Sequence, residues 1–120
     1  MSLEASVRYA GDIAILDLAG RIVLNDGSAT MREAIAKLRE AGSTKILLNF
    51  AGVSFMDSSG LGELASAFSA TNKAGGQLKL VNIPARIMDL LRVTKLDSVL
   101  TSFPSEPAAL ANFNGAAGAA

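Results

Sequence analysis

The sequence contains no cysteine and no histidine. Without cysteine the chain has no disulfide bonds, no thiolate nucleophile and no zinc site built on sulfur. Without histidine it lacks the usual general base near neutral pH and the commonest metal ligand. Few enzyme mechanisms survive both absences, so we expect no catalytic activity, no metal site and no cofactor.

A charge excess of either sign is also missing, because 11 basic residues balance 11 acidic ones. Such a chain has no net field to attract nucleic acid or an anionic membrane. Apolar residues make up 50% of the sequence, but their runs stay far below the ~18 residues of a membrane-spanning helix. The start, Met1-Ser2-Leu3-Glu4, does not resemble a secretory leader. We expect a cytoplasmic protein that neither contacts nucleic acid directly nor inserts into a membrane.

A chain of 120 residues has the size of one domain. We assign residues 1–113 to that domain. Residues 114–120 consist mostly of glycine and alanine, and we expect them to form a flexible tail.

The first part of the chain predicts an antiparallel hairpin. Residues 6–9 alternate in polarity, Gly11 and Asp12 form a turn signal, and residues 13–18 are an apolar run. Gly20 is expected to end this strand, with a short continuation over 21–24. A helix follows, capped by Thr30 with Glu33, or by Ser28 or Asp26.

From that point strands and helices are expected to alternate. The strands fall at 44–50, 77–81 and within 99–103; the helices run from the 26–30 region to Gly42, from Asp57–Ser59 to Asn72, from Pro84 onward and over 107–113. Met88, Leu91 and Val93 near the third helix are assigned to the core, and Lys79 to solvent. The pattern predicts an α/β fold with a mixed, largely parallel sheet of four to five strands, an N-terminal antiparallel hairpin and about four helices.

The segment Asp57-Ser58-Ser59-Gly60-Leu61-Gly62 joins the central strand to the second helix through a loop at 51–56. Aspartate and serine suit a helix N-terminus, and capping alone explains them. The two glycines cost helix stability, so they indicate close approach by another backbone, a ligand or a partner. The free N–H groups of this first turn also suit a phosphate.

Two catalytic interpretations of the segment fail. Ser58 and Ser59 have no histidine base and no Gly-x-Ser-x-Gly context, which excludes a hydrolase nucleophile. A phosphate-binding loop requires Gly-Lys-Ser/Thr after its glycines, and this sequence has none there. An enzyme or nucleotide-binding protein therefore ranks last among the functions considered.

The longer stretch over residues 49–62, Asn-Phe-Ala-Gly-Val-Ser-Phe-Met-Asp-Ser-Ser-Gly-Leu-Gly, closely resembles the signature of the STAS family, the anti-sigma factor antagonists and their relatives. Weaker matches lie at 18–22, 76–82 and 93–96. The resemblance implies a STAS-like fold. It also implies a small switch that binds an anti-sigma factor serine kinase, is phosphorylated by that kinase and is reset by a metal-dependent serine/threonine phosphatase.

The resemblance assigns the phosphate to Ser58, directly after the motif aspartate, with Ser59 as the second candidate. It implies a partner-binding surface made of Asn25, Asp26, Met56, Asp57, Ser58, Ser59, Gly60, Leu61 and Gly62. Of Phe55 and Met56, one is expected to face the core and the other to be free for the partner. Arg21 stands where antagonists often carry glutamate; a solvated strand-end cation explains it, and a partner contact there would imply a different partner.

The same family resemblance leaves one alternative function open. STAS-like subunits also serve ATP-driven lipid transporters, so the chain could be an accessory subunit that docks on the ATPase of an ABC-type lipid transporter. Ser58 would then contribute to docking without carrying phosphate.

Overall fold

The computed structural model describes the backbone of residues 3–119 and the side chains of residues 3–113. Its sheet has five strands in chain order, β1 (Glu4–Ala10), β2 (Ile13–Ile22), β3 (Lys45–Met56), β4 (Gln77–Val81) and β5 (Ser102–Phe103). β1 pairs antiparallel with β2, and every later pairing is parallel. The mixed, largely parallel sheet with an N-terminal antiparallel hairpin is confirmed.

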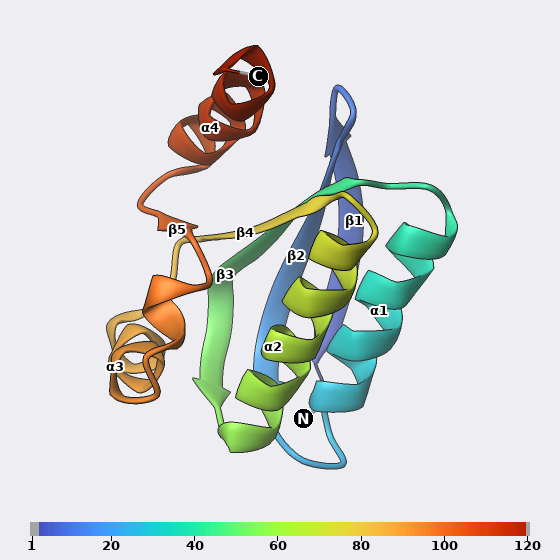
Figure 1. Cartoon of the computed structure of the whole chain (residues 1–120). Coiled ribbons are helices and arrows are strands. Elements are labelled where there is room, and N and C mark those ends of the chain that lie inside the picture. Colours follow the sequence, from blue (N-terminus) through green and yellow to red (C-terminus); the bar gives the residue numbers. More distant parts are fainter. Residues whose placement is uncertain (1–2, 120) are drawn as a thin grey trace.

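The described helices are α1 (Ser28–Glu40), α2 (Ser58–Lys73), α3 (Ala85–Val93) and α4 (Glu106–Ala119), with a 3-10 turn, η1 (Leu96–Ser98). Figure 1 shows α1 and α2 side by side across one face of the sheet. They and α3 bury the main core on that face, whose helical members include Met31, Ile35, Leu61, Leu64, Ile87 and Leu91. In the described part of the chain, no helix has the length and apolar character to cross a bilayer.

α4 covers the other face of the sheet through a second, smaller core. Its buried members are Ile13, Ile15, Leu47, Val81, Ala109 and Phe113. The Arg8 guanidinium donates hydrogen bonds to the carboxylates of Asp17 in β2 and Glu106 in α4, and this lowers the pKa of both acids. The terminal helix is thus held by apolar packing and by an ion-pair network to the hairpin.

The predicted boundaries of two strands are wrong. β2 continues through Gly20 to Ile22, and β3 continues through the expected loop at 51–56. Beyond Asn49, β3 no longer pairs with β4. It still pairs with β2, with register shifts near Ala19 and Arg21. The shifts disturb the alternation of side chains. Residues 51–56 therefore lack the sequence pattern of a strand and were predicted as a loop.

The predicted cap of the first helix is also wrong. The N-cap of α1 is Gly27, and no side chain donates or accepts a capping hydrogen bond there. Gly27 has φ of 105°, and a Cβ on it would lie 2.1 Å from the Arg21 carbonyl oxygen. Only glycine fits this position, so close packing of the loop on β2 decides where α1 begins.

One core assignment and one solvent assignment need correction as well. Val93 is 80% exposed, because it lies two residues beyond Leu91 and so on another side of α3. Lys79 is not simply solvated: its ammonium lies 5.3 Å from the centre of the Phe113 ring, and burial lowers its pKa.

The backbone of α4 extends over most of the segment 114–120, whereas Ala120 lies outside the described residues. Flexibility of that segment stays a prediction.

Phe113 offers a test of how α4 is held. Phe113→Ala removes a fully buried ring from the second core, and we expect it to lower the free energy of unfolding by about 3–5 kcal/mol. Val93→Ala, on the exposed end of α3, is the control and should change stability by less than about 0.5 kcal/mol. Equal losses in urea denaturation would contradict the docking of α4 described above.

Candidate functional site

The junction between β3 and α2 lies at the carboxyl edge of the parallel strands, where open α/β sheets place their working loops. Ile22, at the end of β2, pairs with Met56, at the end of β3. The next residue, Asp57, donates its backbone N–H to the Ile22 carbonyl oxygen at 3.1 Å. Two strand ends therefore fix the position at which α2 starts.

Asp57 is the N-cap of α2, as the sequence predicts, with extended φ and ψ. Its Oδ1 accepts the backbone N–H of Ser59 at 2.9 Å and that of Gly60 at 3.4 Å, as well as the Ser59 hydroxyl. Its Oδ2 accepts the backbone N–H of Leu24 at 3.1 Å. One carboxylate thus holds both the helix N-terminus and the β2–α1 loop.

These contacts favour the charged form of Asp57. The Ser59 hydroxyl is the largest cause of its lowered pKa, with smaller contributions from the N–H groups of Leu24, Ser59 and Gly60; partial burial acts in the opposite direction. At neutral pH the junction therefore carries a fixed negative charge at the helix N-terminus, the end that favours anions.

The two candidate serines differ in what their hydroxyls do. Ser58 is the first residue of α2, is exposed, and makes no side-chain hydrogen bond among the described residues. Ser59 is half-buried and donates its hydroxyl to Asp57. The geometry therefore leaves the Ser58 hydroxyl accessible and engages that of Ser59.

The two glycines also differ. A Cβ on Gly60 would lie 2.4 Å from the Met56 Cγ and 2.8 Å from the Ile22 Cγ2, whereas one on Gly62 would meet nothing within 4 Å. The close approach expected at Gly60 is thus made by the chain's own core. Gly62, one turn after Ser58, leaves the helix surface open.

Met56 and Leu61 are buried beneath the junction, and Phe55 is 43% exposed. The expectation that one of Phe55 and Met56 faces the core is confirmed. The Arg21 guanidinium lies 5.5 Å from the centre of the Phe55 ring, a cation–π distance. This pair was missed, because only the register of β2 with β3 brings the two residues together.

Asn25 and Asp26 lie in a tight turn whose ends are joined by hydrogen bonds between the backbones of Val23 and Asp26. Asn25 is exposed in the left-handed region, with φ of 64°. Leu24 beside it is 66% exposed, although its N–H is bound to Asp57. Sequence reasoning did not single out Leu24; an apolar residue directly before Asn-Asp-Gly was the available signal.

The accessible groups around the Asp57 cap define what we call the junction surface: Arg21, Leu24, Asn25, Phe55, Ser58 and Gly62. A groove of about 280 Å³ adjoins it, lined by Ser54, Phe55, Met56, Arg86, Ile87 and Leu90. The arrangement combines a free hydroxyl, an exposed aromatic–arginine pair and a partly apolar groove. It is suited to contact with another protein.

This combination of a mixed sheet, a helix that starts on an Asp-Ser-Ser cap and an accessible first serine defines a binding domain of the STAS type. The family model of the STAS domain matches residues 4–109. The chain belongs to the STAS family.

The curated relatives found are anti-sigma factor antagonists. The anti-sigma-B factor antagonist of Bacillus subtilis is 30% identical over 100 residues, which cover 83% of this chain and 90% of that protein. The antagonist of the same name from Staphylococcus aureus is 30% identical over 70 residues, 58% of this chain and 65% of that protein.

Solved structures agree on the fold. An anti-sigma factor antagonist from Mycobacterium paratuberculosis superposes with a TM-score of 0.82 at 18% identity, covering 92% of this chain and 93% of that one. Unphosphorylated SpoIIAA superposes with a TM-score of 0.71 at 20% identity, covering 93% and 99%. At these identities the two structures show the fold alone, and it is the curated antagonist relatives that do not favour the transporter-subunit alternative.

The glycine pair supplies a matched test of the junction. Gly60→Ala forces a Cβ against Met56 and Ile22, so we expect a loss of about 1–3 kcal/mol in unfolding free energy. Gly62→Ala meets open space and removes a helix-destabilising glycine, so we expect a gain of up to ~1 kcal/mol. Changes of the same sign in both variants would contradict this packing of α2.

The Asp57 cap predicts a pH dependence. Since the folded state lowers the pKa of Asp57, its charge contributes stability above the unfolded pKa near 3.8, and that contribution is lost as pH falls through the lower, folded value. Asp57→Asn keeps a capping oxygen but no charge. We expect the stability difference between wild type and variant to be largest above about pH 5 and to shrink below pH ~4. A difference that stays constant from pH 7 to pH 3 in thermal unfolding would argue against a charged cap.

Proposed function

We propose that this chain is an anti-sigma factor antagonist that binds an anti-sigma factor serine kinase through its junction surface and is released when that kinase phosphorylates Ser58. The observation that carries the proposal is the contrast between the two serines. Ser58 presents an exposed hydroxyl with no side-chain hydrogen bond among the described residues, whereas the Ser59 hydroxyl is donated to Asp57. A kinase can reach the first without breaking the cap.

Phosphate on Ser58 changes the surface far more than it changes the fold. It adds about 1.5–2 negative charges beside the carboxylate of Asp57. Within the chain, the dipole of α2 favours an anion at this end, while the N–H groups of Ser59 and Gly60 stay bound to Asp57. A partner surface packed against Ser58 has no such compensation, so the phosphate acts by weakening the interface.

The rest of the junction surface gives the partner its specificity. Leu24 and Phe55 supply exposed apolar area, and Asn25 supplies a polar side chain on a rigid turn. Arg21, held against Phe55, calls for an acidic or polar group on the partner. Met56, Gly60 and Leu61 are buried, so their contribution is to support the surface from below.

The remaining parts of the cycle follow from the same site. A serine/threonine phosphatase would reset the switch at the exposed Ser58. The chain itself acts by binding and not by catalysis, and a kinase partner of this class would place it in the cytoplasm.

The test uses the cognate kinase with ATP, or with ADP for binding. Ser58→Ala should bind the kinase like wild type and gain no phosphoryl group in intact-mass spectra. Ser58→Asp should bind at least ~10-fold more weakly, because it places a permanent charge at the interface.

Ser59→Ala is the matched control, since it removes the neighbouring hydroxyl and should still accept one phosphoryl group. Thermal unfolding checks that all three variants are folded. Equal affinity of Ser58→Ala and Ser58→Asp for the kinase would overturn the proposed switch, and phosphorylation of Ser58→Ala but not Ser59→Ala would move it to Ser59.

A further inference from the structure

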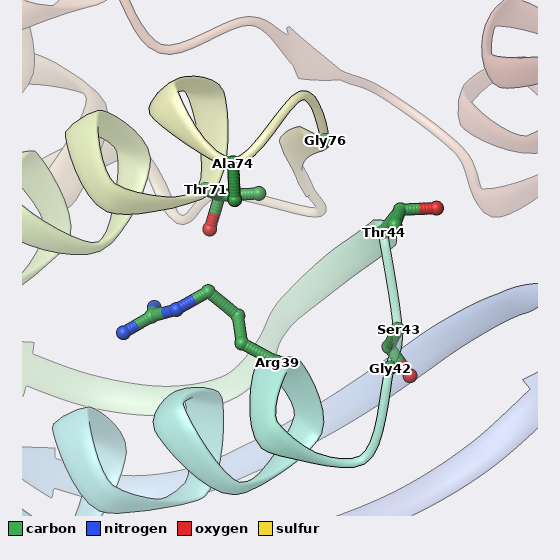
Figure 2. Close-up of a pocket in the computed structure, with 7 residues that line it drawn as sticks. All are labelled: Arg39, Gly42, Ser43, Thr44, Thr71, Ala74 and Gly76. Atoms are coloured by element: carbon green, nitrogen blue, oxygen red, sulfur yellow. The ribbon is translucent and has the colours of Figure 1, made fainter.

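A second site lies at the other end of α1 and α2, away from the junction. There the last turns of both helices and the short segments that precede β3 and β4 surround a pocket of about 200 Å³, lined by Arg39, Gly42, Ser43, Thr44, Thr71, Ala74 and Gly76. Figure 2 shows the side chains of Arg39 of α1 and Thr71 of α2 in the space between the two helices.

Thr71 is unusual because its polar group is buried without a protein partner. The residue is 1% exposed, and its Oγ1 has no hydrogen-bond partner among the described residues. A threonine within a helix can bond the carbonyl oxygen four residues earlier, but this one does not. Figure 2 shows its oxygen directed into the pocket, toward Arg39. Buried hydroxyls almost always have a partner, so this one points to a group that enters the pocket.

The pocket contains a guanidinium, and Figure 2 shows the hydroxyls of Ser43 and Thr44 directed away from it. Its lining has one cation, Arg39, three hydroxyl residues and no acidic residue. In the described part of the chain, no carboxylate forms an ion pair with Arg39. Several late carbonyl oxygens of the two helices are already bonded: those of Lys37, Leu38 and Arg39 in α1, and those of Thr71 and Asn72 in α2. A guanidinium and a hydroxyl that share a pocket without an acid suit an oxyanion.

The wall of the pocket is fixed by tight backbone packing. Gln77 donates its N–H to the Thr44 carbonyl oxygen at 2.6 Å. A Cβ on Gly76 would lie 2.5 Å from that oxygen and 3.1 Å from the Thr71 Cγ2. Glycine at 76 therefore lets the end of α2 close onto the start of β3 and holds Thr71 in place.

We infer that this pocket binds a small oxyanion, with the Arg39 guanidinium and the Thr71 hydroxyl as its donors. The volume of the pocket equals that of several waters at ~30 Å³ each, enough for a phosphate or carboxylate group but not for a nucleotide. The site is formed by residues that the proposed switch does not use. Anion binding there is therefore independent of phosphorylation at Ser58.

The experiment measures thermal unfolding and amide NMR shifts of the full chain with sodium phosphate, sodium acetate or sodium chloride at matched ionic strength. We expect phosphate or acetate at tens of millimolar to raise the unfolding temperature by ~2–5 °C over chloride, with shifts centred on Thr71 and Gly76. The anion that gives the larger response identifies the source as phosphate or carboxylate.

Variants separate a site from general ion effects. Arg39→Gln and Thr71→Val should each weaken half-saturation at least ~10-fold, while Thr71→Val should unfold no earlier than wild type without anion, because it removes an unpartnered hydroxyl. Lys73→Gln, an exposed cation on the same helix outside the pocket, should respond like wild type. Responses that equal the chloride control, or that persist unchanged in both Arg39→Gln and Thr71→Val, would overturn the inference.

Discussion

The carboxylate of Asp57 is the contact on which the functional end of this molecule depends. With one oxygen it caps α2 and holds the Ser59 hydroxyl, and with the other it fixes the backbone of Leu24 in the β2–α1 loop. The start of α2 and the β2–α1 loop are thereby both fixed to the paired ends of β2 and β3. Because Asp57 engages Ser59, the accessible hydroxyl at the start of α2 is that of Ser58, and the proposed switch acts at this residue.

That frame explains why a switch here can act without refolding the domain. Gly60 packs α2 onto Met56 and Ile22, and the remainder of the helix is anchored in the main core. A charge added at the helix N-terminus meets a favourable dipole. A phosphate on Ser58 would therefore weaken the contact with a partner more than it would destabilise the fold. The far end of the same helix carries Thr71, which places the inferred oxyanion pocket on an equally rigid support.

The sequence predicted those features that are encoded locally. The hairpin, the central strands and the start of α2 at Asp57 follow from alternation, helical spacing and capping preference. Features that depend on distant pairing were missed: the second half of β3 is held only by its register with β2, and Arg21 meets Phe55 only through that register. Which serine is free also requires geometry, since either could donate to Asp57. The motif itself was recognisable, whereas Arg39 and Thr71 have no sequence signal that links them.

The most direct test of the account is the position of the phosphate on the unmodified chain. Wild-type protein is incubated with its cognate kinase and ATP, and the phosphorylated residue is located by fragmentation mass spectrometry. The Asp57-centred geometry predicts one phosphoryl group, on Ser58, with Ser59 unmodified. Phosphate on Ser59, or a chain that the kinase binds but never modifies, would contradict the central claim.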